Sequence, residues 1–477
     1  MTDIIDELAW RGLLWQSTDL DDLRKALDAG PVTVYAGFDP TAPGLHIGSL
    51  ALLLTLRRLQ DAGHRPIGVV GGATGLIGDP SGRTSERVLN AEDVVAGWVQ
   101  RIRAEVARFL DVSEGSERAA LIVSNLDWTA PLSAIDFLRE IGKHFSVNQM
   151  VARESVKARL DSGGISYTEF SYQVLQALDY LELYRRYGCT LQIGGSDQWG
   201  NLVAGVDLIR RVESGTAHAL TIPLITKRDG TKFGKTESGT VWLDAELTSP
   251  YAFYQFWFNV EDAEVGKLLR VFTFRSRDEI EALEREAAER PAARTAQRVL
   301  AEDVTTLVHG AGECQRVIAA SRALFGQGDL SALDERVLAA ALAEVPTVTV
   351  SAVPGTVISG PGGAAGPAGP AVATGPAGAT GAAGSAEAPV RVSSVADLLT
   401  CAGLVGSKSA ARRVISEGGA YLNNRKVTSE DEVPEPGDLL HGRFLVLRRG
   451  KRTVGGAEVA GRTAGSVSGP ASGPAAE

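Results

Sequence analysis

Four short apolar runs, each followed by glycine or small polar residues, constrain the fold of this chain more than any other feature. They lie at residues 32–36, 66–70, 121–123 and 191–193, and segments of helical character separate them. Short apolar strands that alternate with helices are typical of a parallel sheet covered on both faces. We therefore expect an α/β fold with a doubly wound, Rossmann-like sheet that binds ligands beyond the carboxyl ends of its strands.

Charge and cysteine content exclude several other classes of protein. The chain has 477 residues and a formal net charge of −10, which argues against a protein that simply coats DNA or RNA. Its three cysteines, Cys189, Cys314 and Cys401, are far apart and have no CxxC spacing. We therefore expect neither a disulfide framework nor a protein-bound metal.

The acidic opening segment and the short apolar runs bear on localisation. Residues 1–7 are unlike a secretory or organellar leader, and runs such as 50–54 are too short to span a bilayer. We expect a cytoplasmic protein without a membrane partner.

Changes in composition predict five segments. Residues 249–345 carry Ala, Glu, Arg and Leu at helical spacing, residues 353–389 are dominated by Gly, Ala and Pro, and residues 391–452 hold 11 Lys/Arg against 7 Asp/Glu. The expected parts are a sheet domain at 1–248, an α-helical domain at 249–350, a flexible linker at 351–390, a small α+β domain at 391–452 and a disordered tail at 453–477.

His46 is the first candidate for phosphate binding. It follows Asp39-Pro40-Thr41 and a Pro-Gly turn, at the predicted start of a helix. An open helix start offers unpaired N–H groups and a positive dipole to a nucleotide. A lone histidine at such a place is more often structural, but the tight turn from strand to helix favours the nucleotide role.

A second candidate is the basic loop Lys232-Phe233-Gly234-Lys235-Thr236. Taken alone, it is typical of a solvated surface loop. Together with His46 on a doubly wound sheet, its two lysines and hinge glycine suit the neutralisation of a departing pyrophosphate.

The glycine-rich segment 71–82 matches neither the P-loop nor the GxGxxG pattern, because it lacks the closing Gly-Lys-Ser/Thr and the required spacing. Its glycines allow the backbone to approach a small ligand closely, and Asp79 offers a carboxylate to an ammonium group. Arg83 and Arg87 follow, either as cationic contacts to pyrophosphate or as ordinary surface arginines.

Polar residues on one face of a predicted helix at 167–180 indicate a binding pocket. Tyr172, Gln176, Asp179 and Tyr180 share that face, and three such polar groups are costly to bury without partners. A core-facing aromatic stripe is the alternative. Asp197, which follows the fourth strand, suits a ribose hydroxyl or the N-cap of the next helix.

The two phosphate-binding candidates resemble the HIGH and KMSKS signatures of class I aminoacyl-tRNA synthetases. Segments 35–41, 71–82, 142–148 and 191–201, together with loop 232–236, resemble bacterial tyrosyl-tRNA synthetases. The resemblance covers about residues 1–350 and 391–452. It implies activation of L-tyrosine with ATP to tyrosyl adenylate and pyrophosphate, followed by transfer of tyrosine to the 3′-terminal ribose of tRNA(Tyr).

The resemblance also implies residue roles. Those that stabilise the leaving pyrophosphate are Thr41, His46, Lys232, Lys235, Arg83 and Arg87. Those that bind tyrosine are Tyr35, Asp39, Asp79, Tyr172, Gln176, Asp179 and Gln198, of which Tyr35 and Asp179 meet the phenol. Those that bind ATP are His46, Gly48, Ser49, Gly195, Asp197 and Lys235.

The basic segment 391–452 resembles a small RNA-binding module, in which Lys408, Arg412 and Arg413 meet tRNA phosphates. A solvated basic helix is the alternative. The resemblance further implies a homodimer, and ATP with Mg²⁺ as substrate without a protein-bound metal or organic cofactor.

Two residues depart from the family pattern. Ser49 stands at the last position of the HIGH signature in place of histidine, and Arg83 replaces a lysine. The alternatives to a tyrosine-activating enzyme are a tryptophan-activating relative, which would not need Tyr35 and Asp179, and a catalytically impaired homologue that binds structured RNA.

Overall fold

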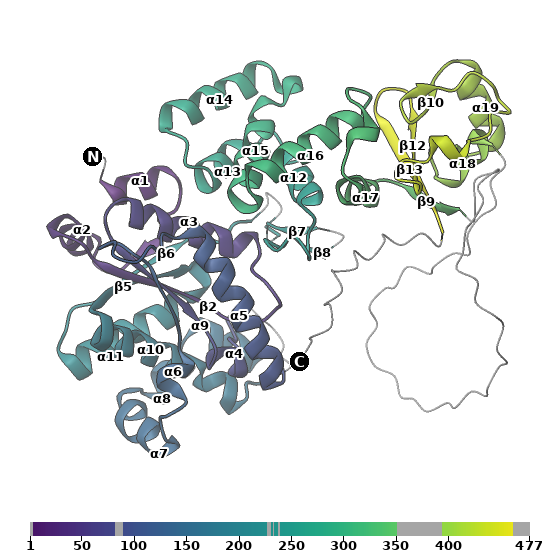
Figure 1. Cartoon of the computed structure of the whole chain (residues 1–477). Helices are drawn as coiled ribbons and strands as arrows, with labels where there is room; N and C mark the ends of the chain where they lie inside the picture. The colour runs from purple at the N-terminus through teal and green to yellow at the C-terminus, as the bar shows by residue number, and fades with distance from the viewer. Residues whose placement is uncertain are drawn as a thin grey trace, which may run out of the picture. The chain divides into compact units, whose positions relative to one another are not determined.

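The computed structural model describes residues 3–81, 89–226, 230–231, 233–236, 239–350 and 394–460. The chain divides into two compact units, residues 1–310 and 311–477 (Figure 1). Arg83, Arg87 and Lys232 lie outside the described residues, as does the expected linker at 351–390. None of the described helices is both long and apolar enough to cross a bilayer.

The first unit is built on a six-stranded sheet with the order β1-β6-β5-β2-β3-β4. Neighbours from β6 to β4 run parallel, whereas the short β1 is antiparallel to β6. The strands are β1 (Gln16–Ser17), β2 (Thr33–Phe38), β3 (Arg65–Val70), β4 (Leu121–Ser124), β5 (Cys189–Gly195) and β6 (His218–Ile222). The four predicted strands and the doubly wound parallel sheet are thus confirmed, while β1 and β6 escaped prediction because their runs are short and include polar residues.

Helices cover both faces of this sheet. α3 and α5 pack on one face, and α10 and α11 pack on the other (Figure 1). The helical segments up to β6 are α1 (Ile4–Trp10), α2 (Leu20–Ala29), α3 (Ile47–Asp61), α4 (Thr74–Ile77), α5 (Glu92–Phe109), α6 (Leu126–Thr129), α7 (Ala134–Asp136), η1 (Phe137–Ile141), η2 (Gly142–His144), α8 (Val147–Val151), α9 (Glu154–Ser162), α10 (Tyr167–Tyr187), η3 (Ser196–Gln198) and α11 (Trp199–Glu213). The two-stranded β7 (Lys235–Thr236) and β8 (Gly239–Thr240) follow β6.

Local sequence explains the bounds of α10, the helix predicted at 167–180. The Ser166 side chain accepts a hydrogen bond from the Glu169 N–H and so caps the helix start. Gly188 ends the helix in the left-handed conformation, with φ of 61°. Between them, Leu178 and Tyr180 are buried in the core, where the Tyr180 ring meets Tyr35 edge-on at 5.1 Å between centroids.

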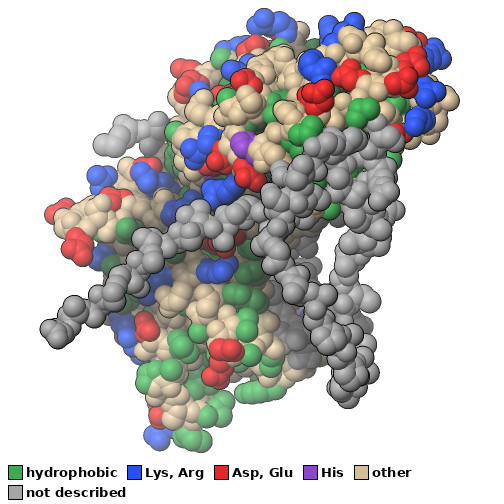
Figure 2. Space-filling model, turned by 45° about the vertical axis from the view of Figure 1, so that its right-hand side comes forward, with side chains coloured by type: hydrophobic (Ala, Val, Ile, Leu, Met, Phe, Trp, Pro, Cys, Tyr) green, Lys and Arg blue, Asp and Glu red, His purple; other side chains and the backbone are tan. Residues whose placement is uncertain are grey.

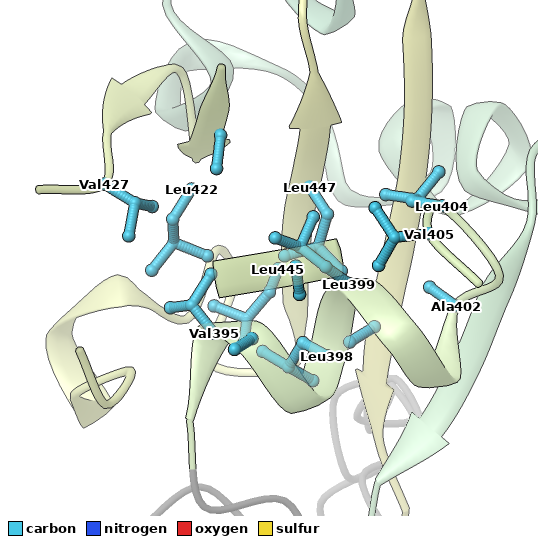
Figure 3. Close-up of a cluster of buried hydrophobic side chains, with 14 of the residues drawn as sticks. Val395, Leu398, Leu399, Ala402, Leu404, Val405, Leu422, Val427, Leu445 and Leu447 are labelled. Carbon is cyan, nitrogen blue, oxygen red and sulfur yellow. The ribbon is translucent and has the colours of Figure 1, made fainter. Parts of the chain in front are cut away.

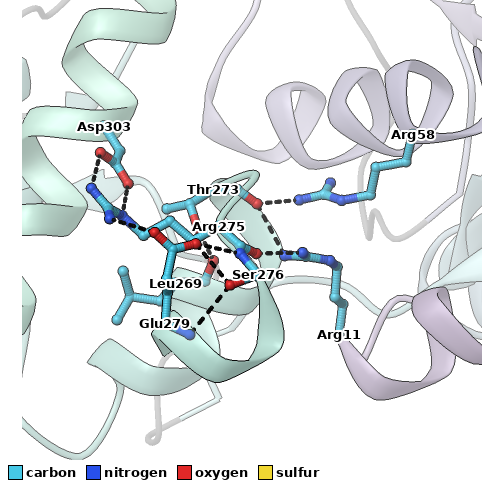
Figure 4. A network of polar contacts seen from close by, with 8 residues as sticks. All are labelled: Arg11, Arg58, Leu269, Thr273, Arg275, Ser276, Glu279 and Asp303. Carbon is cyan, nitrogen blue, oxygen red and sulfur yellow. Dashed lines mark hydrogen bonds and ion pairs between the residues drawn. The ribbon is translucent and has the colours of Figure 1, made fainter. Parts of the chain in front are cut away.

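The remainder of the first unit is helical. Its segments are α12 (Pro250–Phe258), α13 (Val265–Phe272), α14 (Arg277–Glu289), η4 (Pro291–Ala293) and α15 (Thr295–His309). Two buried arginines, Arg11 at the C-terminal cap of α1 and Arg58 within α3, donate to backbone carbonyls at the end of α13 (Figure 4). The carbonyl of Thr273 accepts from both, at 3.0 and 2.7 Å. The last carbonyls of a helix lack partners within it, so these cations hold α13 against the sheet domain.

The second unit combines helices with a five-stranded sheet of order β11-β10-β12-β13-β9. Its elements are α16 (Ala311–Leu324), η5 (Leu330–Ala332), α17 (Glu335–Ala343), β9 (Thr347–Val350), α18 (Val395–Cys401), α19 (Lys408–Ser416), β10 (Ala420–Leu422), β11 (Arg425–Lys426), η6 (Pro436–Asp438), β12 (Phe444–Arg449) and β13 (Thr453–Val459). Val395, Leu399, Leu422 and Leu447 belong to the apolar cluster that packs α18 and α19 on this sheet (Figure 3).

The observed elements depart from the expected boundaries at two places. β13 extends ordered structure to Val459, beyond the predicted end at 452, and β9 pairs with it in parallel from residues 347–350. The segment TVGGAEV has the composition of a tail, yet its glycines allow close packing. A Cβ added at Gly456 would lie 2.8 Å from Leu342 Cδ2 and from Thr347 Oγ1.

Candidate active site

Two adjoining pockets lie beyond the carboxyl ends of β2, β3 and β5, where a doubly wound sheet binds ligands. The inner pocket has a volume of about 200 Å³ and the outer pocket about 310 Å³. Gly37, Asp39, Thr41, Leu52 and Gly195 line both, so the two form one continuous site. Together they reach the size usual for small-molecule sites.

The inner pocket contains the residues predicted to bind tyrosine. Its polar lining consists of Tyr35, Asp39, Thr41, Thr74, Asp79, Asn125, Tyr172, Gln176, Asp179, Gln192 and Gln198. The predicted helix face thus points three polar residues into a pocket, but Tyr180 is not among them, because its hydroxyl donates to the His218 carbonyl at 2.7 Å. Among the residues that the structure describes, the lining holds three aspartates and no lysine, arginine or histidine, which favours a ligand with a cationic group.

Tyr35 and Asp179 form a polar end of the inner pocket. Both are buried, with exposed fractions of 2% and 5%. Asp179 accepts hydrogen bonds from Asn125 Nδ2 at 3.0 Å and from Trp128 Nε1 at 2.8 Å. Burial raises the pKa of Asp179 to about 7, against the lowering effect of these two donors. Burial and the nearby charge of Asp179 raise the pKa of Tyr35, so its hydroxyl stays protonated.

Buried polar atoms without partners mark where a ligand bonds. Within the described residues, Tyr35 Oη, Gln176 Oε1 and Gln192 Oε1 have no hydrogen-bond partner. Leaving such an atom unpaired costs about 1–3 kcal/mol. A ligand hydroxyl beside Tyr35 and a donor beside the two glutamines would recover this cost.

Asp39 lies at the centre of a hydrogen-bond chain. Tyr172 Oη and Thr74 Oγ1 donate to its two oxygens, each at 2.6 Å. Asn125 Nδ2 in turn donates to Thr74 Oγ1 at 2.9 Å as well as to Asp179. The chain therefore joins the carboxylates of Asp39 and Asp179. It also needs Gly71, because a Cβ there would collide with the side chains of Asp39 and Thr74.

Asp79 is held at the other side of the inner pocket. Its Oδ2 accepts from Gln198 Nε2 at 2.6 Å, and its Oδ1 accepts from the Ser81 N–H at 2.9 Å. Asn201 Nδ2 donates to Gln198 Oε1 at 3.0 Å and fixes the orientation of that amide. Asp79 is thus an oriented carboxylate, and its predicted role as the partner of an ammonium group stays a prediction.

The outer pocket gathers the residues predicted to bind ATP. Of these, His46, Gly48, Ser49, Gly195 and Asp197 line it. Thr41, predicted to stabilise the pyrophosphate, lines it as well, together with Phe233 and Gly234 of the basic loop. Asp197 does not cap α11, contrary to the structural alternative, because Gln198 occupies that position. Instead it lies within the short helix η3 at the edge of the pocket.

His46 has the structural role weighed for it, and it lines the outer pocket, where the nucleotide role was expected. It is the N-cap of α3, and its Nδ1 accepts from the Ser49 N–H at 3.3 Å. In the neutral ring this places the proton on Nε2, so Nε2 is the donor nitrogen of the ring. Gly48 allows the arrangement, since a Cβ there would lie 2.8 Å from His46 Cε1. Ser49 supplies a backbone N–H, which any residue could do.

The structure describes residues 233–236 of the basic loop. Phe233 packs on Phe256 and Trp257, at 5.0 and 5.6 Å between ring centroids, and so anchors the loop. Gly234 follows with φ of 87°, a conformation that favours glycine. The backbone of Lys235 belongs to β7, but its side chain, like Lys232, Arg83 and Arg87, lies outside the described part of the chain.

The residues predicted to bind tRNA lie on α19 in the second unit. Lys408, Arg412 and Arg413 are exposed, with Lys408 paired to Asp397 at 2.7 Å and Arg413 to Glu417 at 2.8 Å. These surface pairs contribute little to stability, so the cations can exchange their partners for phosphates.

Sequence reasoning missed Thr74, Asn125, Trp128 and Gln192. Asn125 carried a signal, because it directly follows the strand at 121–124 and polar residues at such strand ends commonly face a ligand. Gln192 lies inside a strand, and Trp128 lies in a four-residue helix, so neither carried one.

Comparison with known proteins gives consistent results. Residues 27–326 match the family "tRNA synthetases class I (W and Y)", and residues 380–454 match the "Tyrosine--tRNA ligase SYY-like C-terminal domain". The chain is 59% identical to the tyrosine--tRNA ligase of Streptomyces avermitilis, over 97% of this chain and 100% of that protein. It is 58% identical to that of Acidothermus cellulolyticus, with the same coverage.

A solved structure has the same fold. The C-terminally truncated mitochondrial tyrosyl-tRNA synthetase of Aspergillus nidulans matches with a TM-score of 0.61 and 28% identity. The match covers 68% of this chain and 94% of that structure.

Proposed function

Because this chain belongs to the tyrosine--tRNA ligases of class I, we propose that its two pockets bind L-tyrosine and ATP side by side. The enzyme activates L-tyrosine with ATP to tyrosyl adenylate and pyrophosphate, and then transfers tyrosine to the 3′-terminal ribose of tRNA(Tyr). The family includes tryptophan enzymes, so the choice of amino acid needs its own physical support.

The polar end of the inner pocket carries the assignment to tyrosine. A phenol hydroxyl there would donate to Asp179 and accept from the unpaired Tyr35 hydroxyl. Phenylalanine would leave the buried Tyr35 hydroxyl unpaired and would offer no donor to Asp179. The preference of tyrosyl-tRNA synthetase for tyrosine over phenylalanine is a known case of this effect. Asp79, Tyr172 and Gln176 would hold the α-ammonium group. The Tyr172 hydroxyl also donates to Asp39, and the Gln198 amide donates to Asp79.

Adenylate formation needs positioning and charge stabilisation but no covalent enzyme intermediate. A tyrosine carboxylate oxygen bonds to the α-phosphorus of ATP as the bond to the bridging oxygen breaks, and pyrophosphate leaves with that electron pair. The open N-terminus of α3, with His46 Nε2 and Thr41, would stabilise this charge. We assign the same role to Lys232, Lys235, Arg83 and Arg87.

ATP would enter with Mg²⁺ on its phosphates, as a substrate complex. Ser49, Gly48 and Gly195 would contact the nucleotide, and the Asp197 carboxylate would accept from a ribose hydroxyl. No cluster of metal-ligating side chains occurs among the residues that the structure describes.

We propose that different segments of the chain have different roles in the reaction with tRNA. Residues 1–248 would perform the chemistry, residues 249–350 would approach the anticodon stem, and the basic module from residue 391 would hold the long arm through Lys408, Arg412 and Arg413. This assignment is supported by the exposure of those cations and by the family of the C-terminal domain. We place the enzyme in the cytoplasm, where tRNA is charged.

We further propose that the enzyme is a homodimer. Ile135 and Val147 of the segment α6–α8 are 70% and 61% exposed, and Leu138 between them is 52% exposed. Figure 2 shows hydrophobic side chains gathered at the lower end of the view, where α7 and α8 lie. A contiguous apolar surface of this kind is typical of an interface between subunits.

Tyrosine-dependent ATP–pyrophosphate exchange tests the proposed function. We expect exchange with tyrosine and not with phenylalanine or tryptophan. Tyr35→Phe and Asp179→Asn should reduce the discrimination, whereas Tyr184→Phe, a matched change outside the inner pocket, should preserve it. Exchange with tryptophan in place of tyrosine would contradict the assignment of substrate. Absence of exchange by a folded protein that binds tRNA would contradict the activity.

A further inference from the structure

We propose that Glu105 is a positioning residue for adenylate formation, which holds the backbone before His46 in the geometry that the reaction needs. This inference rests on the proposed function of the outer pocket. Glu105 lies on α5, 60 residues along the chain from the loop that it contacts. No feature of its sequence neighbourhood distinguishes it from other helical glutamates.

The contact is short and buried. Glu105 Oε2 accepts a hydrogen bond from the Leu45 N–H at 2.7 Å, and the two residues are 6% and 4% exposed. Leu45 stands between the Pro-Gly turn and the N-cap His46, outside any helix or strand. Its N–H therefore has no partner in secondary structure and depends on a side chain.

The carbonyl of Leu45 is held from the opposite side. It accepts from the Leu243 N–H at 2.9 Å, and His46 forms an isolated antiparallel bridge with Trp242. The loop before α3 is thus fixed between α5 and residues 242–243. The His46 side chain is exposed, and its ring lies 6.4 Å from that of Trp242 between centroids, so its position depends strongly on the backbone of this loop and of residue 242.

Residues 241–243 also contact the basic loop at 232–236. The Val241 N–H donates to the Gly234 carbonyl at 2.8 Å, and Gly234 lies between the two lysines of that loop. Residues 241–243 therefore connect the basic loop to the backbone that Glu105 holds. A shift of Leu45 would be transmitted to both groups that meet the phosphates.

Burial of a carboxylate at this position costs free energy, because the charged group loses its contact with water. Burial, with a smaller contribution from the nearby Asp244, raises the pKa of Glu105 to about 7, although the hydrogen bond from the Leu45 N–H and the charges of Arg108 and Arg101 lower it. Its second oxygen, Oε1, has no partner within the described residues and would lie 3.3 Å from a Cβ at Gly44. An apolar side chain could fill this space, whereas the carboxylate also supplies the acceptor for the Leu45 N–H, which supports a positioning role.

The test compares Glu105→Leu, which removes the acceptor, with Glu105→Gln, which keeps an amide oxygen at the same length. Pre-steady-state formation of tyrosyl adenylate is measured per active site, with tyrosine binding measured separately. We expect Glu105→Leu to slow adenylate formation by about 10- to 100-fold while the Kd of tyrosine changes less than about twofold. Glu105→Gln should recover most of the rate.

A matched control addresses general destabilisation. Gln60 is also buried, and its Oε1 accepts from the Asp111 N–H at 2.9 Å, away from both pockets. Gln60→Leu therefore removes this bond, together with the two that Gln60 Nε2 donates to the carbonyls of Asp111 and Arg118, and should still leave the rate per active site unchanged. Equal losses in Glu105→Leu and Gln60→Leu, or a parallel loss of tyrosine affinity, would overturn the proposal.

Amide hydrogen exchange separates this proposal from the proposed function, since it needs no activity. The peptide that contains Leu45 should exchange faster in Glu105→Leu than in the wild type, with Glu105→Gln between them. Unchanged exchange there would overturn the positioning role. If exchange is faster in Glu105→Leu but the wild-type protein forms no adenylate, the contact between Glu105 and Leu45 is supported and the proposed function is rejected.

Discussion

Single side chains in the inner pocket depend on partners contributed by distant elements. Asp179 comes from α10, while Asn125 and Trp128, which donate to it, come from the region after β4. The two donors stabilise the charged form and burial opposes it, which leaves the pKa of Asp179 at about 7. The carboxylate is therefore available to a phenol without being fully ionised before the ligand arrives.

This balance makes the stability of the unliganded enzyme depend on pH. The pKa of Asp179 is raised from 3.8 to about 7, so its contribution to stability is complete below pH 3.8 and is lost as pH rises through 7. The loss is up to roughly 4 kcal/mol. Asp179→Asn should remove this part of the pH dependence in urea unfolding at pH 5–8, whereas Asp127→Asn, at an exposed position, should not. Equal slopes in Asp179→Asn and the wild type would contradict the assignment.

Helices in the first unit are positioned by groups at their ends. The C-terminal carbonyls of α13 accept from Arg11 and Arg58, and burial of Arg58, with the charge of Arg11, lowers its pKa to about 9. Arg58 lies near the end of α3, the helix that begins at His46. One helix thus contributes to the ATP site at its start and secures the helical segment near its end.

Two substitutions separate the capping role of His46 from its chemical role. Asparagine is a good N-cap, whereas alanine is not, so His46→Ala should lose about 1 kcal/mol of stability and His46→Asn should lose little. Both lose the Nε2 donor and should slow adenylate formation by about 100-fold or more. Thermal unfolding and pre-steady-state kinetics measure the two effects. A near-normal rate in His46→Asn would show that the histidine serves only as a cap.

For the whole molecule, the exposed apolar surface on α6–α8 predicts self-association. Ile135→Glu with Val147→Glu places two charges on that surface and should convert a dimer to a monomer in sedimentation experiments. Val112→Glu, at a position 45% exposed elsewhere in the unit, is the matched control. A wild-type protein that sediments as a monomer at micromolar concentration would reject the homodimer.

The second unit should affect tRNA and not amino-acid activation. Replacing Lys408, Arg412 and Arg413 with alanine should raise the KM for tRNA about 10-fold and reduce its salt dependence, because fewer phosphate contacts form. Pyrophosphate exchange should be unchanged. Arg336→Ala, an exposed arginine on α17, serves as the control for charge loss in this unit. An unchanged KM would favour a solvated basic helix.

Sequence patterns among residues close together in the chain were sufficient to predict much of the fold and part of the candidate site. The runs at 32–36, 66–70, 121–123 and 191–193 are β2 to β5, and the helix face with Tyr172, Gln176 and Asp179 lines a pocket. Such features are readable because strand and helix periodicity depends on residues a few positions apart. The family resemblance added the expected roles, and comparison with known proteins confirmed the family.

Contacts between distant residues could not be read in this way. The chain from Asp39 through Thr74 and Asn125 to Asp179, and the hold of Glu105 on Leu45, join residues 35 to 60 positions apart. The pKa of Asp179 depends on burial, which exists only once the sheet and its helices have packed. Residue types and local periodicity therefore specify the elements and the candidate groups, while packing alone selects which of those groups meet and how strongly each is charged.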